Sequence, residues 1–101
     1  MSPEAMDLKD ERLTQKPGLQ ARLVDGEMVI LDLATGRVHH LNGTAGFIWS
    51  RFDGTASLDV VAECVAEQFE VDRRVAERDV KELAHRLTEI GLLVAEAAVN
   101  G

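Results

Sequence analysis

The stretch EMVILDLATGRVHHLNGTAGFIW, residues 27–49, contains the change of hydrophobic period that decides the fold. Residues 27–33 and 37–41 are rich in aliphatic and β-branched side chains, and a short Ala-Thr-Gly turn joins them. Beyond them the apolar residues recur at helical spacing. The stretch therefore predicts an antiparallel hairpin followed directly by a helix over about residues 43–52, which Asn42 caps and Gly54 ends.

The sequence on the N-terminal side adds one more strand. Residues 20–24 are compatible with a strand, and the Asp-Gly pair that follows is a strong signal for a tight hairpin turn. This predicts a three-stranded antiparallel sheet. Residues 1–18 are polar, lack a steady period and end in Lys-Pro-Gly, so we expect a flexible N-terminal arm. The compact domain is then expected over residues 19–95, with a C-terminal tail at 96–101.

Two further helices are predicted on the C-terminal side. Ser57 can cap a helix in which apolar residues recur at helical spacing up to residue 69. Asp72 can cap a longer one, over about residues 73–90, with Gly91 just past its end. A short extended segment could follow. The order is βββααα, an α+β fold that resembles a winged helix-turn-helix in size and spacing.

Composition narrows the classes of function. The chain has 101 residues, enough for one small domain, and 46% of them are hydrophobic. It carries 18 acidic against 11 basic residues, a net charge of −7, which argues against nucleic-acid partners and against an anionic membrane surface. No apolar run approaches the roughly 20 residues of a membrane span. A lone cysteine, Cys64, excludes an intrachain disulfide and fits the cytoplasm.

The histidines do not have the spacing of a metal or catalytic site. His39 and His40 are neighbours on a predicted strand, so their side chains point to opposite faces. His85 lies on the third helix without a second histidine or a cysteine one turn away, and Cys64 lies at the border of an amphipathic helix. No glycine-rich phosphate loop or nucleophile motif is present. We therefore expect no metal, no cofactor and no enzymatic activity.

The predicted architecture favours peptide binding. A three-stranded meander has two edges, and an exposed edge can pair with a strand of another chain. If residues 37–41 are such an edge and lie beside the third helix, the two form a groove with one hydrogen-bonding wall and one apolar wall. The sequence by itself does not show which strand is the edge.

A series of short motifs, each weak alone, stands in a fixed order between residues 23 and 93: Asp25-Gly26, Val29, Leu31-Asp32, Thr35-Gly36-Arg37, Leu41-Asn42, Ala45, Ile48-Trp49, Asp53-Gly54, Val71-Asp72 and Ile90-Gly91-Leu92. In this order they resemble the PqqD-like proteins, peptide chaperones of pyrroloquinoline quinone synthesis and related pathways. The same domain is called a RiPP recognition element. The resemblance covers about seven-tenths of the chain.

The resemblance implies a function and partners. Members of this family bind the leader of a ribosomally synthesised precursor peptide between their third strand and third helix. They present the peptide to a separate maturation enzyme, which is a radical SAM enzyme, a cyclase or a leader peptidase. This chain would then be a non-catalytic peptide chaperone that binds the leader by β-strand addition.

The resemblance also implies the binding residues. On the strand they are Arg37, Val38, His39, His40 and Leu41. On the third helix the apolar floor would consist of Val80, Leu83, Ala84 and Leu87. One flank of the helix carries Lys81 and Thr88, and the other carries Asp79 and Arg86. The sequence does not decide between these flanks, and we favour Lys81 and Thr88.

Two alternatives stay open on the sequence alone. The first is a winged-helix regulator that binds DNA through the third helix, although acidic residues offset the arginines there. The second is a structural subunit of a larger complex. In that case an edge strand could pair with its own copy to give a homodimer.

Overall fold

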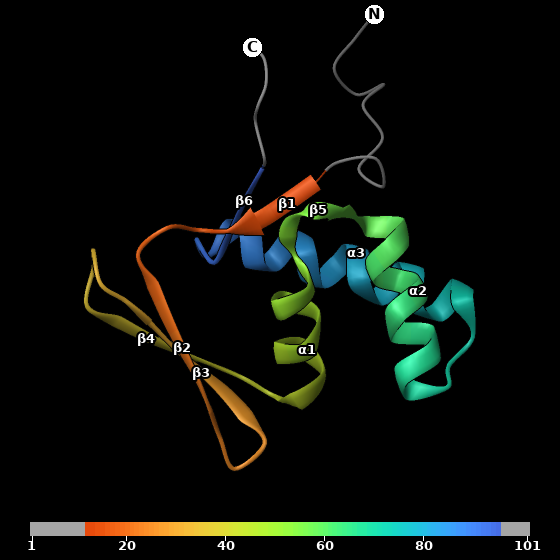
Figure 1. Ribbon diagram of the computed structural model, residues 1–101, viewed down its shortest axis with the longest axis horizontal. Coiled ribbons are helices and arrows are strands. Elements are labelled where there is room, and N and C mark those ends of the chain that lie inside the picture. The colour runs from red at the N-terminus through yellow and green to blue at the C-terminus, as the bar shows by residue number, and fades with distance from the viewer. Residues whose placement is uncertain (1–11, 96–101) are drawn as a thin grey trace, which may run out of the picture.

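The computed structural model describes residues 12–95, which form two three-stranded antiparallel sheets and three helices (Figure 1). The sheet expected from the sequence consists of β2 (Leu19–Val24), β3 (Glu27–Asp32) and β4 (Arg37–Leu41), hydrogen-bonded in the order β2-β3-β4. β2 and β3 form one antiparallel hairpin, and β3 and β4 form the next. The predicted meander is therefore confirmed.

The β2–β3 hairpin turns in the way its sequence predicts. Asp25 and Gly26 both have positive φ, at 50° and 81°. A two-residue hairpin turn with two positive φ angles has the twist that suits the flanking strands, and Asp-Gly is among the few pairs that adopt it readily. The turn fixes the register, in which Val24 pairs with Glu27.

The three helices also lie where the apolar spacing predicts them: α1 is Gly43–Arg51, α2 is Leu58–Phe69 and α3 is Arg73–Glu89. Each begins at the expected cap, because the side chains of Asn42, Ser57 and Asp72 accept hydrogen bonds from backbone N–H groups of the first turn. Gly91 has a φ of 85° just after the end of α3, as the sequence predicts.

The second sheet was not predicted. It consists of β1 (Arg12–Gln15), β5 (Asp53–Ser57) and β6 (Leu93–Ala95), in the order β5-β1-β6. The expected arm is therefore wrong for residues 12–15, and the rest of the arm at residues 1–11, like the tail at 96–101, lies outside the described residues. The only predicted part of this sheet is the short extended segment at β6.

The first helix, expected over about residues 43–52 with Gly54 just past its end, ends at Arg51, but the chain then enters the strand β5 at Asp53. The sequence of β5, Asp-Gly-Thr-Ala-Ser, has the composition of a turn, and the Asp53 carboxylate accepts hydrogen bonds from the N–H and hydroxyl of Thr55. Pairing with β1 makes it a strand all the same. Because of this second sheet, "winged helix" describes the fold only loosely.

The core lies among the helices and between the two sheets. In Figure 1 the β2-β3-β4 sheet lies on one side of α1 and α2 lies on the other, while α3 runs behind α1. Ile30 of β3, Ile48 of α1 and Leu87 of α3 are fully buried within it. Trp49 is buried as expected, and its indole N–H donates to the Leu92 carbonyl at 2.9 Å. The indole thus ties α1 to the connection between α3 and β6.

Candidate functional site

Among residues 12–95, β4 is a free edge of the first sheet, since it pairs with β3 alone. Its side chains alternate between the two faces as the sequence predicts. His39 is half-buried and Leu41 is buried on the face turned to the helices, whereas Val38 and His40 are exposed on the outer face. Arg37, at the start of the strand, is exposed. One edge of backbone hydrogen-bonding groups is thus open to another strand.

The outer-face histidine has a surface partner. The His40 imidazole Nδ1 lies 3.8 Å from a carboxylate oxygen of Glu27, and both side chains are more than half exposed. Within residues 12–95, no group of three or more histidine, cysteine and acidic side chains could hold a metal ion.

Asp32, at the end of β3, holds the loop that leads into β4. It is the buried charged residue of this sheet, at 4% exposure. Its carboxylate accepts hydrogen bonds from the Lys16 ammonium at 3.2 Å and from the Ala34 N–H at 3.0 Å. Burial by itself would raise the pKa of Asp32, but these hydrogen bonds and the positive charge of Lys16 outweigh it and lower the pKa below 3.8.

A groove of about 250 Å³ lies between the start of α1 and the middle of α3, next to the end of β4. The residues that line it are Asn42, Thr44, Ala45, Ile48, Asp79, Glu82, Leu83 and Arg86. Its floor is apolar, and its α3 side carries two carboxylates and one guanidinium. An extended chain that followed β4 would reach this groove.

The predicted residues of α3 divide into two groups. Val80, Ala84 and Leu87 are at most 3% exposed and belong to the core, so they lie beneath the surface of the helix. Leu83 is half-buried and lines the groove. Among the four residues expected to form the apolar floor, Leu83 is the one the groove exposes.

Lys81 and Thr88 do not line this groove. Both line a separate cavity of about 180 Å³, whose other walls include Leu13 of β1 and Leu58 of α2. The Thr88 hydroxyl donates to the Ala84 carbonyl at 2.8 Å. The structure therefore brings Lys81 and Thr88 to the second sheet, whereas Asp79 and Arg86 are the flank that shares a groove with α1.

The sequence interpretation missed the contribution of α1 to the groove. Thr44, Ala45 and Ile48 line it together with α3. A signal for this was present: a single residue, Asn42, separates the end of β4 from the start of α1. A connection that short forces the first turn of α1 to lie beside the end of the strand edge.

Comparisons with known proteins point to one family. A protein-family model described as "Coenzyme PQQ synthesis protein D (PqqD)" matches residues 27–93. A comparison with curated protein sequences finds no significant match. The matched residues extend from the start of β3 to the start of β6, and so include the β4 edge and all three helices.

Solved structures resemble the chain over most of its length. A lasso peptide synthetase B1 solved with its leader peptide is 32% identical, covers 82% of this chain and 98% of its own, and superposes with a TM-score of 0.72. TbiB1 in complex with the TbiA(beta) leader peptide is 23% identical, covers 86% and 99%, and has a TM-score of 0.71.

A third structure is the PqqD truncation of Methylobacterium extorquens PqqCD, described as a functional and stand-alone RiPP recognition element. It is 20% identical, covers 93% of this chain and 99% of its own, and has a TM-score of 0.71. At their identities, TbiB1 and the PqqD truncation establish the fold alone.

Proposed function

This chain belongs to the PqqD family, and we propose on that premise that it is a non-catalytic recognition domain for the leader of a ribosomally synthesised precursor peptide. The observation that carries the proposal is the resemblance to a lasso peptide synthetase B1 solved with its leader, at 32% identity over most of both chains. The free β4 edge and the adjoining groove supply a surface suited to an extended peptide.

The leader binds by adding a strand to β4. Backbone hydrogen bonds from residues 37–41 give affinity that depends little on the peptide sequence, and the alternate side chains of the peptide give specificity. Side chains on the inner face meet the half-buried His39 and then the groove beside α1. Side chains on the outer face stand next to Val38 and His40.

On α3, Leu83 provides the apolar contact, and Asp79, Glu82 and Arg86 surround it. This flank replaces Lys81 and Thr88 in the proposal, because those two residues line a cavity next to β1 and α2. The buried side chains of Val80, Ala84 and Leu87 pack in the core behind this face of α3. The mixed charges of the wall suit a leader that carries both an acidic and a basic side chain near its apolar anchor.

The chain acts together with a maturation enzyme that performs the chemistry. A radical SAM enzyme, a cyclase and a leader peptidase are the candidate classes, and the recognition domain delivers the peptide to whichever belongs to its pathway. None of the described helices is long and apolar enough to cross a membrane.

The proposal is tested by titrating the chain with a fluorescently labelled leader of the precursor peptide from its pathway. We expect a Kd between nanomolar and low micromolar, roughly −12 to −8 kcal/mol. Leu83→Lys should weaken binding about tenfold or more, because it places an ammonium in the apolar floor of the groove. Val60→Lys is the matched control, since Val60 is 47% exposed on α2 and lines no part of the groove.

Two outcomes would contradict the proposal. One is the absence of leader binding at peptide concentrations near millimolar. The other is binding that Leu83→Lys and Val60→Lys weaken equally. Salt-dependent binding to a short DNA duplex would instead favour a regulator that binds nucleic acid. This function is the weaker candidate, because the chain has 18 acidic residues and 11 basic ones.

A further inference from the structure

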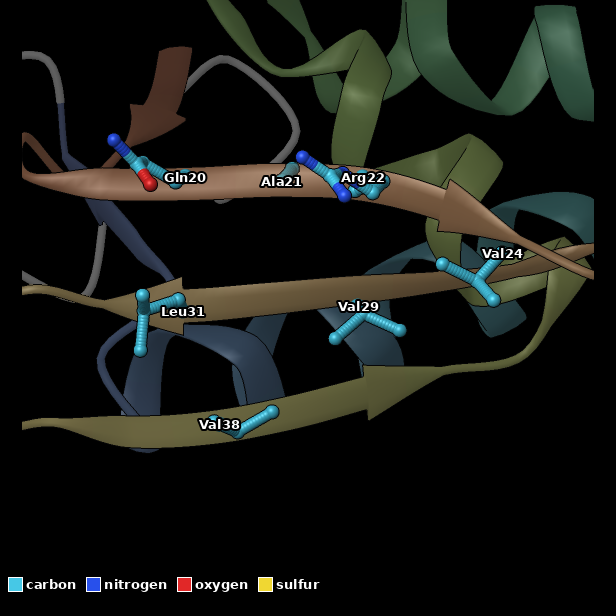
Figure 2. A pocket seen from close by; sticks show the side chains of 7 residues that line it. All are labelled: Gln20, Ala21, Arg22, Val24, Val29, Leu31 and Val38. Carbon is cyan, nitrogen blue, oxygen red and sulfur yellow. The ribbon is translucent and has the colours of Figure 1, made fainter.

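The outer face of the β2-β3-β4 sheet, turned away from the helices, carries a cluster of apolar side chains (Figure 2). Figure 2 shows Val24, Val29, Leu31 and Val38 on this face, contributed by all three strands. A hollow of about 820 Å³ lies over them. We call these four side chains the outer patch.

The outer patch is exposed to solvent. Val38 is 54% exposed and Val24 is 43% exposed, while Val29 and Leu31 are half-buried between their neighbours. In an antiparallel sheet with one face on the core, the other face is commonly polar. A cluster of aliphatic side chains from three adjacent strands with a polar rim is instead typical of a protein interaction surface.

The β2 side of the outer patch carries a positive charge, and the Glu27 carboxylate lies opposite Val24 at one end of the patch. Gln20 and Arg22 lie on β2 beside the patch. Within the described part of the chain, Arg22 forms no ion pair, although the chain as a whole has a net charge of −7. A partner that covers the patch can therefore place a carboxylate against Arg22 and bury apolar side chains against the valines.

The outer patch is continuous with the β4 edge. Leu31 pairs with Val38, and Val29 pairs with His40, so the patch extends to the strand to which the leader is proposed to add. A strand paired with β4 projects alternate side chains onto the same outer face, next to Val38. Leader and patch then form one surface, which exists in full only when the leader is bound.

We propose that the outer patch is the docking surface for the maturation enzyme, and that the bound leader completes this surface. The inference rests on the proposed function and adds the site at which the second partner binds. The enzyme contributes an apolar element for the valines and leucine, with an acidic side chain opposite Arg22. Docking on the composite surface makes the enzyme select the leader-loaded form of the domain.

A second copy of the chain fits the outer patch less well. Face-to-face pairing about a two-fold axis would bring together two chains that each carry a net charge of −7. The carboxylate on this face, Glu27, lies 3.8 Å from the His40 imidazole of its own chain. An acidic group on a different protein satisfies Arg22 without this repulsion.

The test measures two affinities for each variant: that of the free domain for the labelled leader, and that of the leader-loaded domain for the purified modifying enzyme of the same pathway. The patch variants are Arg22→Glu and Val24→Asp, both on β2 and two strands away from the leader edge. Their matched controls are Arg74→Glu on α3 and Val60→Asp on α2, which are exposed and lie outside the patch.

For the unmodified chain, we expect the leader to tighten enzyme binding by about tenfold. Both patch variants should weaken enzyme binding about tenfold or more, with leader affinity changed less than about twofold. The two controls should change neither affinity. Unchanged leader affinity also shows that the patch variants fold.

The two proposals fail in different ways. If the unmodified chain does not bind the leader, the proposed function fails, and the inference that rests on it fails too. If the leader binds but Arg22→Glu and Val24→Asp bind the enzyme as tightly as their controls do, the inference alone is overturned. Sedimentation tests a further outcome. If the unmodified chain forms a dimer and Val24→Asp abolishes that dimer, the outer patch binds a second copy of the chain.

Discussion

Asp32 connects three segments of the chain through one buried carboxylate. It accepts hydrogen bonds from Lys16, which precedes β2, and from Ala34 in the loop before β4. The neighbouring Leu33 N–H donates to the Gly18 carbonyl at 3.0 Å, which adds a backbone link between the same two segments. The position of the β4 edge therefore depends on this one ionised side chain.

Asp32→Asn should lower stability at neutral pH and have less effect in acid. The pKa of Asp32 is lowered in the folded state, so its ionised form adds stability above the ordinary value of 3.8, and this stability is lost as the pH falls through the folded pKa. Urea unfolding at about pH 7 and about pH 3 measures the free energy of unfolding of each protein. The difference in this free energy between wild type and variant should be smaller at the lower pH. A difference that stays the same at both pH values would contradict the role of the charge.

Gly46 allows α1 to lie against β3. A Cβ at this position would stand 2.8 Å from the Cβ of Met28, an atom that no side-chain rotation can move away. Gly46→Ala should therefore destabilise the fold by about 1–2 kcal/mol, even though alanine favours a helix more than glycine does. Thr44→Ala, an exposed change in the same helix, should be neutral or slightly stabilising. Denaturant unfolding compares the two, and a Gly46→Ala variant as stable as wild type would contradict the close approach.

At the scale of elements, β1 joins parts of the fold that the sequence pattern treats as separate. The Gln15 amide donates to the carbonyls of Trp49 and Phe52 at the end of α1, both at 3.2 Å. The Lys16 N–H donates to the Leu92 carbonyl, which also accepts the Trp49 indole. Gln15 and Lys16, at and just after the end of β1, thus donate to carbonyls at the end of α1 and in the connection between α3 and β6.

Gln15→Ala should cost about 1–2 kcal/mol of folding free energy, because the carbonyls of Trp49 and Phe52 lose a side-chain donor, although the Trp49 carbonyl keeps the Phe52 N–H. Gln20→Ala on β2 is the matched control, since Gln20 is exposed. Thermal or denaturant unfolding measures both. Equal effects at the two positions would mean that the contact with α1 contributes nothing to stability.

The predictable elements are those whose signals are local. The Asp25-Gly26 turn, the three N-caps and the helical apolar stripes each depend on neighbouring residues, and all appear in the structure. The second sheet depends on pairing between segments about 40 to 80 residues apart. The strand β1 contains one buried apolar residue, Leu13. Its hydrophobic alternation is therefore too weak to predict a strand from the sequence.

The candidate site was predictable on its strand side and less so on its helix side. The alternation along residues 37–41 follows from strand geometry alone. The choice of flank on α3 depends on how far the helix is rotated about its axis, which α1 and the second sheet decide together. The contacts of Lys81 and Thr88 beside Leu13 therefore could not be read from the spacing within α3.

At the scale of the whole molecule, the first sheet separates two proposed binding surfaces. Its inner face and β4 edge adjoin the helices and the leader groove, and its outer face carries the patch for the enzyme. The second sheet lies on the other side of the core and braces α1 and α3. A small domain can in this way hold a peptide and present it without enclosing it.

Strand addition at β4 is tested most directly by amide hydrogen exchange, measured by NMR with and without saturating leader peptide. The sheet has two free edges, β4 and β2, so it contains its own control. The account predicts that alternate amides within residues 37–41 exchange about tenfold or more slowly when the leader is bound, while those of β2 do not change. Saturating leader that protects β2, or that protects neither edge, would contradict strand addition at β4.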